Sequence, residues 1–353
     1  MSTLSTPLTA LVGCQHPIVQ TGMGWVAGPS LVSASSNAGA LGILASATMT
    51  FEELERAIVE TKARTNKPFG VNMRADASDA AARVDLLIKH GVKVASFALA
   101  PKQDLIAKLK DHNILVMPSV GAARHAEKVA AWGADAVMIQ GGEGGGHTGP
   151  VPTTLLLPTV LDAVDIPVVA AGGFFDGRGL AAALAYGAAG IGMGTRFLLT
   201  QESKVPDSVK QRYLSADLNG TVVTAKVDGM PHRMLRTALV EEVESTGFLN
   251  RLGPATRRAI EFRKQSGMSW TELVKDGLRM KKAGDRSVAQ MALAANTPML
   301  LKAGLVEGDV NAGVLASGQV VGVINDIPTC AELVDRIMQG AVAELDRLAT
   351  YRS

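Results

Sequence analysis

Short apolar runs alternate along the first part of the chain with segments whose apolar positions recur at helical spacing. The runs are continuously apolar, which is typical of strands buried on both faces of a parallel sheet. They are PIVQ from residue 17, ALGILA from 40, FGVNM from 69, KVASFA from 93, ILVMPS from 114, DAVMIQ from 135, IPVVAAG from 166 and AGIGMG from 189. The segments between them that we predict to be helices include residues 51–65, 81–91, 102–112 and 123–134.

Eight strand-then-helix units within about 200 residues match the size of an α/β fold of the (β/α)₈ TIM barrel class. An open doubly wound sheet is the alternative, but no GxGxxG opens the first helix. We predict a barrel domain over residues 1–199, an inserted basic helical cap over 200–295, and a return to the barrel over 296–353. The segment from Pro328 onward is predicted to be an amphipathic helix that seals the barrel exterior or makes a homodimer contact.

Composition narrows the class of protein. The 353 residues are 47% hydrophobic and 19% charged, as in an ordinary globular chain, and the formal net charge of +2 gives no reason to expect a nucleic-acid partner. Cys14 and Cys330 have no metal-binding spacing, which favours a reducing cytoplasm, and no metal site is predicted. No run of eighteen apolar residues occurs, so we expect no membrane span.

Positive charge gathers in one segment of the predicted cap. Residues 251–286 contain ten Lys or Arg and four Asp or Glu. Such a segment usually forms a solvated surface. The functional alternative is a landing site for an anionic substrate handle.

Two glycine-rich turns follow the seventh and eighth predicted strands, where barrel enzymes commonly hold phosphate. They are AGGFFDGRG at 171–179 and GMGTRF at 192–197. Gly172, Gly173, Gly194 and Thr195 can bring backbone amides and a hydroxyl to a phosphate group. Asp176 and Arg178 are expected to cap and pair within the loop.

Polar or small residues end three other strands, in QTGMG at 20–24, VNM at 71–73 and PSVG at 118–121. A flat heteroaromatic ring needs donors and acceptors at its edges and a thin apolar floor. The residues that meet this description are Gln20, Gly22, Met23, Asn72 and Ser119. Each could instead belong to the core or to a turn, and Met23 in particular is a common filler.

The loop after the sixth strand, QGGEGGGHTGP at 140–150, contains the strongest candidate for a general base. His147 lies between Gly146 and Gly149, and a neutral imidazole is a suitable base near neutral pH. A loop histidine bonded to a nearby carbonyl is the alternative. Glu143 is expected to orient the loop, and His232, in GMPHRMLR, is the second candidate histidine. Arg233 and Arg236 could bind a phosphate or thioester handle, although surface pairing is the default.

The motifs QTGMGWV, PFGVN, GGEGGGH, AAGGFFDGRG, GMGTRF and LASGQ (315–319) resemble the FMN-dependent nitronate monooxygenase family and the related flavin-containing enoyl-acyl-carrier-protein reductases. The resemblance covers nearly the whole chain. Within this family, the segments VDGMPHRMLRT and AANTPMLLKAGL most resemble those of actinobacterial flavoproteins of steroid-ring degradation, which act on a CoA thioester.

The resemblance implies an FMN cofactor and His147 as the catalytic residue. It places the FMN phosphate at the two glycine-rich turns and the ring along residues 20–23 and Asn72. The further residues expected around the cofactor are Thr21, Gln140, Gly145, Gly146, Ser317, Gly318 and Gln319. Independently of the resemblance, His232, Arg233 and Arg236 are expected on the substrate side.

Three functions stay open at this point. The first is dehydrogenation or reduction of an acyl-CoA thioester with NAD(P)(H) as the other electron partner. The second is a nitronate monooxygenase that uses oxygen. The third is a barrel that binds flavin or phosphate without catalysis and serves regulation or assembly, because a barrel fold does not specify a function.

Overall fold

The computed structural model describes residues 4–245, 288–311 and 313–351. They divide into two compact units, which are described separately below. The first, the barrel unit, comprises Met1–Gly144, Thr148–Lys204 and Val323–Ser353. The second, the insert unit, comprises Gly145–His147 and Val205–Gly322. The predicted domain boundaries at residues 199 and 295 remain a prediction.

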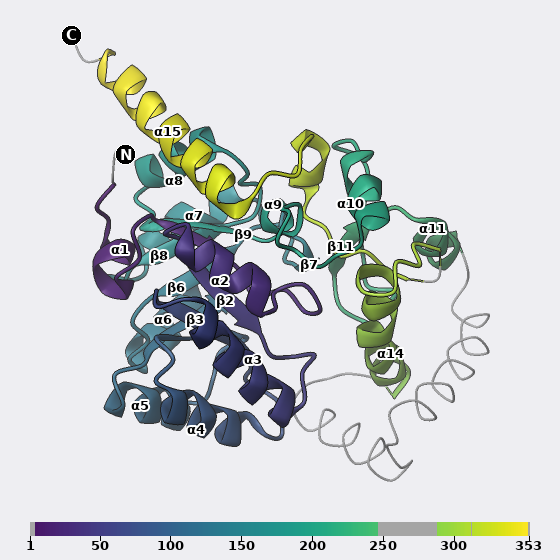
Figure 1. The fold of residues 1–353 in the computed structure, drawn as a ribbon, viewed down its shortest axis with the longest axis horizontal. Coiled ribbons are helices and arrows are strands. Elements are labelled where there is room, and N and C mark those ends of the chain that lie inside the picture. Colours follow the sequence, from purple (N-terminus) through teal and green to yellow (C-terminus); the bar gives the residue numbers. More distant parts are fainter. Residues whose placement is uncertain (1–3, 246–287, 312, 352–353) are drawn as a thin grey trace. The chain divides into compact units, whose positions relative to one another are not determined.

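The barrel unit contains a closed barrel of eight parallel strands (Figure 1). Each strand pairs with the next along the chain, and the last one pairs back with the first, where Val19 lies opposite Gly192. The (β/α)₈ prediction and all eight predicted strands are therefore confirmed. The strands are β1 Ile18–Gln20, β2 Leu41–Ala45, β3 Phe69–Arg74, β4 Val94–Ala98, β5 Leu115–Val120, β6 Val137–Gln140, β8 Val168–Ala171 and β9 Gly190–Met193.

Helices follow the strands and cover the outside of the barrel. The four predicted helices are confirmed as α3, α4, α5 and α6, and α3 begins at a capping box in which Thr50 and Glu53 bond each other's backbone. The helices of this unit are α1 Pro7–Val12, α2 Pro29–Asn37, α3 Phe51–Arg64, α4 Ala80–His90, α5 Gln103–Asp111, α6 Ala123–Ala131, α7 Thr153–Leu161, α8 Gly177–Tyr186, α9 Thr195–Leu198 and α15 Cys330–Ala349.

Alternate residues of each strand serve two cores. On β2, Leu41 and Ile43 point into the barrel and pack in one buried cluster with residues such as Met138, whereas Leu44 belongs to the outer cluster under the helices. Leu8 of α1 packs in the inner cluster. A Cβ on Gly190, the first residue of β9, would lie 2.8 Å from Cδ2 of Leu8. Helix α1 therefore closes the N-terminal end of the barrel, and the loops after the strands form the other end.

The C-terminal helix α15 packs along α8 (Figure 1). Its predicted amphipathic character is confirmed, because Leu333, Val334, Ile337, Met338 and Ala341 are buried. Thr329 and Glu332 form a capping box at its start. The contact with α8 means that this helix seals the exterior of the barrel.

The insert unit contains a three-stranded antiparallel sheet in the order β10-β11-β7, formed by Thr221–Thr224, His232–Leu235 and Gly146–His147. Its described helices are α10 Asp207–Leu214, α11 Ala238–Ser245, α14 Val288–Leu305 and the 3₁₀ helix η2 Gln319–Val323. A helical cap is predicted for this region, and the sheet is an additional feature of the structure. The basic segment 251–286 lies outside the described residues. Among the helices that the structure describes, none has both the length and the apolar character needed to cross a bilayer.

Candidate active site

The two glycine-rich turns lie at the C-terminal end of the barrel. Gly172 and Gly173 follow β8 and have φ angles of 105° and 84°, a backbone region that favours glycine. Gly194 follows β9, and a Cβ there would lie 3.2 Å from Oγ1 of Thr21 and 3.4 Å from Sδ of Met23. The ends of β1 and β9 are therefore in close approach. Asp176 caps α8 by accepting from the Gly179 amide and pairs with Arg178, as expected.

The residues predicted along a flavin ring gather at the ends of β1 and β3. Gln20 is buried, and its Nε2 donates to the carbonyls of Thr21, at 2.6 Å, and Ile43, at 3.3 Å. Its Oε1 has no hydrogen-bond partner within the described part of the chain. A Cβ on Gly22 would lie only 2.6 Å from Cβ of Asn72, so this position admits no side chain.

Ser119 and Gln140 complete the same end of the barrel. Ser119 lies near the end of β5, in register with Ala98 of β4 and Met138 of β6. Gln140 is the last residue of β6, and a Cβ on Gly144 would lie 2.6 Å from its Nε2. The cofactor residues predicted within the barrel unit therefore lie in the C-terminal halves of the strands, as Asn72 and Ser119 do, or at and just after the strand ends.

Glu143 fastens the loop after β6 to the next helix. Its carboxylate accepts hydrogen bonds from the amide of Thr153, at 3.0 Å, and from the hydroxyl of the same residue, at 2.8 Å. Thr153 is the first residue of α7, where a negative charge is favourable. The geometry matches the expectation that Glu143 orients the loop.

Within the insert unit, the two candidate histidines share one carboxylate. Nε2 of His147 lies 2.7 Å from Oδ2 of Asp228, and Nδ1 of His232 lies 2.9 Å from the same oxygen. The histidines form a cross-strand pair of β7 and β11, with ring centroids 4.7 Å apart. His147 is half-exposed, whereas Asp228 and His232 are buried. We call these three residues the His–Asp–His cluster.

Asp228 is held as a carboxylate. Burial opposes its ionisation, but hydrogen bonds from His147 and His232 and the electrostatic attraction of the two rings outweigh burial and hold the pKa of Asp228 well below its usual range. Its second oxygen, Oδ1, accepts the amide of Met230 at 3.1 Å. A carboxylate only accepts hydrogen bonds. The ring nitrogens that face it, Nε2 of His147 and Nδ1 of His232, therefore both carry hydrogen.

Two imidazoles and a carboxylate are also a donor set for a divalent metal, and the three ligand atoms lie within 4.8 Å of one another. The contacts of 2.7 and 2.9 Å to a single oxygen are nevertheless those of charge-assisted hydrogen bonds. Hydrogen bonding alone accounts for this arrangement.

The remaining predicted residues of the insert unit lie around the same sheet. A Cβ on Gly145 would lie 2.5 Å from the amide nitrogen of Gly318 and 2.6 Å from the carbonyl carbon of Ser317. Arg233 lies opposite Gly146 and donates to the hydroxyl of Thr221 at 2.9 Å. The other two are Arg236, which is exposed and donates to the carbonyl of Asn219, and Gln319, which donates to the carbonyl of Leu218.

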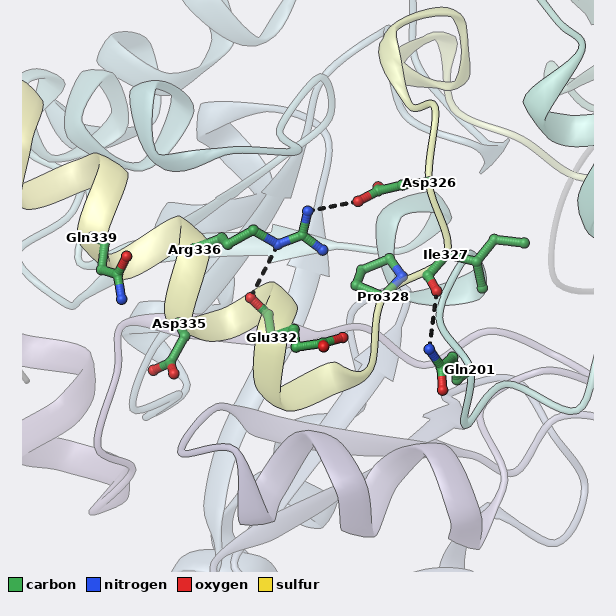
Figure 2. A pocket seen from close by; sticks show the side chains of 8 residues that line it. All are labelled: Gln201, Asp326, Ile327, Pro328, Glu332, Asp335, Arg336 and Gln339. Carbon is green, nitrogen blue, oxygen red and sulfur yellow. Dashed lines mark hydrogen bonds and ion pairs between the residues drawn. The ribbon is translucent and has the colours of Figure 1, made fainter.

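A cavity of about 550 Å³ lies elsewhere, at the start of α15 (Figure 2). Asp326 and Arg336 form an ion pair beside it, and Gln201 donates to the carbonyl of Ile327. None of its lining residues belongs to the predicted site. It is an open surface depression lined mainly by polar and charged side chains, and we assign it no function.

Asp228 is the member of the cluster that was not predicted from the sequence. It stands four residues before His232, in VDGMPHR, and its partner His147 lies 81 residues away. An acid four residues from a candidate histidine was the available signal. The contact of Asp228 with His147 depends on the pairing of β7 with β11, which no local sequence pattern predicts. The substrate-side role predicted for His232 remains a prediction.

Known proteins resemble the chain over its full length. A dehydrogenase of Rhodococcus jostii (strain RHA1), named for (3aS,4S,5R,7aS)-5-hydroxy-7a-methyl-1-oxo-octahydro-1H-indene-4-carboxyl-CoA, is 68% identical over 353 residues, which is 100% of both chains. A dehydrogenase of the same name from Mycobacterium tuberculosis (strain ATCC 25618 / H37Rv) is 65% identical over 97% of each chain.

A solved structure agrees with the fold. FabK from Thermotoga maritima superposes with a TM-score of 0.79 at 34% identity, covering 99% of this chain and 100% of its own. The sequence pattern of the nitronate monooxygenase family, which consists of flavin-dependent oxidoreductases, matches residues 5–83 and 79–340. The chain therefore belongs to the nitronate monooxygenase family.

Proposed function

We propose that this protein is an FMN-dependent dehydrogenase of a carboxyl-CoA thioester derived from steroid rings, with His147 as the general base. The observation that carries the proposal is the His–Asp–His cluster, which presents a half-exposed imidazole bonded to a buried carboxylate. The two relatives at 68% and 65% identity, both named for such a dehydrogenation, support the choice of substrate class.

Three features of the barrel rim support an FMN site there. Gly172 and Gly173 expose backbone in a conformation suited to a phosphate, beside the start of α8. The unpartnered Oε1 of buried Gln20 is an acceptor for an N–H at a ring edge. Because Gly22 has no side chain, no Cβ projects beside Asn72, which leaves a surface suited to a flat ring. We propose the barrel residues named above as the cofactor site. A cofactor contact of Gly145, Gly146 and residues 317–319, which belong to the insert unit, stays a prediction of the sequence.

His147 would act on the carbon next to the thioester carbonyl. That carbon is carbon 4 in the substrate for which the relatives are named, because it bears the carboxyl-CoA group. The carbonyl acidifies its C–H bond, and the imidazole takes the proton. The C–H electron pair forms a double bond to the β-carbon as a hydride departs from there. When bound, FMN supplies the acceptor for that hydride.

The CoA handle would meet cationic groups. Arg233 and Arg236 are the described candidates, and the basic segment 251–286 is a second source of positive charge. We propose NAD(P)⁺ as the acceptor that takes the electrons from the reduced flavin, and a cytoplasmic location. Oxygen as the electron acceptor is the alternative, and it belongs to a nitronate monooxygenase.

Anaerobic bleaching of the flavin tests this proposal. The purified holoenzyme is mixed separately with a steroid-ring carboxyl-CoA thioester, a nitroalkane, a nitronate, NADH and NADPH, and the yellow absorbance is followed. The proposal expects the thioester to bleach the flavin. Bleaching by nitroalkane and nitronate but not by the thioester would establish the monooxygenase instead.

The base is tested by His147→Ala. This variant should keep bound FMN but lose about 10² to 10⁴ in the rate of bleaching by the thioester, the range typical of a general base. Reduction by dithionite requires no base and should proceed as in the wild type. Unchanged bleaching by the thioester would place the base at another residue.

A further inference from the structure

The contacts of the His–Asp–His cluster fix the position of the Asp228 carboxylate. One oxygen of Asp228 accepts from His147 at 2.7 Å and from His232 at 2.9 Å, while the other accepts the Met230 amide. The carboxylate is therefore fixed from three directions. It lies in a buried site, where a charge that lost these partners would be costly.

We propose that Asp228 and His232 are positioning residues that act through His147. Asp228 holds the hydrogen of the neutral His147 ring on Nε2, which leaves Nδ1 as the atom that takes the substrate proton. His232 donates from Nδ1 to the same oxygen and holds the carboxylate in that position. The inference rests on the proposed role of His147 as base.

The negative charge of Asp228 supports this arrangement in addition to its geometry. When Nδ1 takes a proton from carbon, the ring becomes an imidazolium and the electron pair remains with the substrate. The negative charge of Asp228, 2.7 Å from Nε2, stabilises that imidazolium. A neutral amide at residue 228 would remove this stabilisation and could also present its NH₂ group to the histidines.

The side chain of His232 is buried and contacts Asp228. It is 2% exposed, and its Nε2 has no hydrogen-bond partner among the described residues. Its ring is therefore held through the bond from Nδ1 to Asp228. The side-chain NH₂ of an asparagine occupies nearly the position of Nδ1, so His232→Asn keeps a donor where His232→Leu has none.

The first test reads the histidine tautomers of the resting holoenzyme. With ¹⁵N-labelled histidine, long-range ¹H–¹⁵N correlation spectra at pH 8 distinguish protonated from unprotonated ring nitrogens. We expect hydrogen on Nε2 of His147 and on Nδ1 of His232. Hydrogen on Nδ1 of neutral His147 would overturn the inference. Because this readout requires no turnover, it stands apart from any failure of the proposed activity.

The second test compares variants with the thioester as substrate. Asp228→Asn should lower kcat about 10² to 10⁴-fold, with KM changed much less and the FMN content retained. His232→Asn should retain at least about tenfold more kcat than His232→Leu, as a donor-based role requires. Equal kcat for the two His232 variants, or a wild-type kcat in Asp228→Asn, would overturn the inference.

Asp207→Asn is the matched control, because it makes the same chemical change in the same unit on a side chain that is 93% exposed. It should leave kcat as in the wild type. If Asp228→Asn fails to fold, the His232 pair and the tautomer spectra still decide the matter. A wild type that shows the expected tautomers but does not oxidise the thioester would refute the proposed function alone.

Discussion

Single residues differ in how strongly their surroundings control their chemistry. Cys14 and Cys330 are buried, and both are free thiols. Burial raises the pKa of Cys330 to about 12, and the neighbouring charge of Glu202 adds to this rise. Burial also raises the pKa of Cys14 to about 11, against a smaller opposing effect of a backbone hydrogen bond. The thiolate is the reactive form of cysteine, so neither residue has the character of a redox site.

We therefore expect both cysteines to be silent toward a disulfide reagent in the native protein. At pH 8, each folded thiol keeps its proton because pH 8 lies well below a raised pKa, and burial excludes the reagent as well. Ellman's reagent should give no rapid colour from the native protein. In guanidinium chloride, two thiols per chain should react.

Ser215→Cys supplies the comparison, because Ser215 is exposed in the insert unit. Its thiol should react in the native state at a rate near that of a small-molecule thiol. A native wild-type protein that reacted as fast as this variant would show that one of the two buried sites opens readily.

At the scale of elements, the contact between α8 and α15 depends on the absence of one side chain. Gly177 begins α8, and a Cβ there would lie 2.3 Å from the backbone nitrogen of Ala341 and 2.4 Å from the carbonyl carbon of Gly340. Backbone atoms inside a helix cannot move aside as a flexible side chain can. The two helices approach this closely because both carry glycine at the crossing.

Gly177→Ala should therefore lower the free energy of unfolding by about 1–3 kcal/mol or more, the usual cost of overpacking. Chemical denaturation of the holoenzyme measures it. Gly121→Ala is the matched control, because a Cβ there meets nothing within 4 Å, and its effect should stay within about 0.5 kcal/mol. Equal stability of the two variants would mean that α15 docks differently.

The elements of the barrel could be predicted from the sequence because each strand is buried on both faces. A run such as ALGILA must be apolar throughout when one side faces the barrel interior and the other faces helices. The helices between them follow from apolar spacing and caps. Those signals are local, and they extend to the glycine-rich turns, whose place after β8 and β9 follows from strand order alone.

The sheet of the insert unit could not be predicted in this way. Its strand β7 has two residues, Gly146 and His147, and its partner β11 lies beyond residue 230. No periodicity can be read from two residues, and glycine has little strand preference. The sequence therefore indicated His147 and His232 separately. The carboxylate that joins them emerges only from the pairing of strands distant in the chain.

At the scale of the whole molecule, charge is distributed unevenly. The chain has a formal net charge of +2, yet residues 251–286 contain ten basic and four acidic residues. Long-range attraction between such a segment and an anionic ligand is screened by salt, with a Debye length of about 8 Å at physiological ionic strength. Coenzyme A carries several negative phosphate charges, so this attraction would act on the handle and not on the reacting carbon.

If the proposed function is correct, KM for a CoA thioester should rise several-fold as sodium chloride increases from about 50 to about 500 mM, whereas kcat should change little. Screening weakens binding of the handle but leaves the distance from base to carbon unchanged. Steady-state kinetics of the holoenzyme measure both constants. The same acyl group on pantetheine, which lacks the phosphates, should show a KM that hardly depends on salt. If KM rose equally with salt for the two thioesters, ionic strength would be acting on the protein itself. A salt-independent KM for the CoA thioester would exclude electrostatic capture of the handle by residues 251–286 or by Arg233 and Arg236.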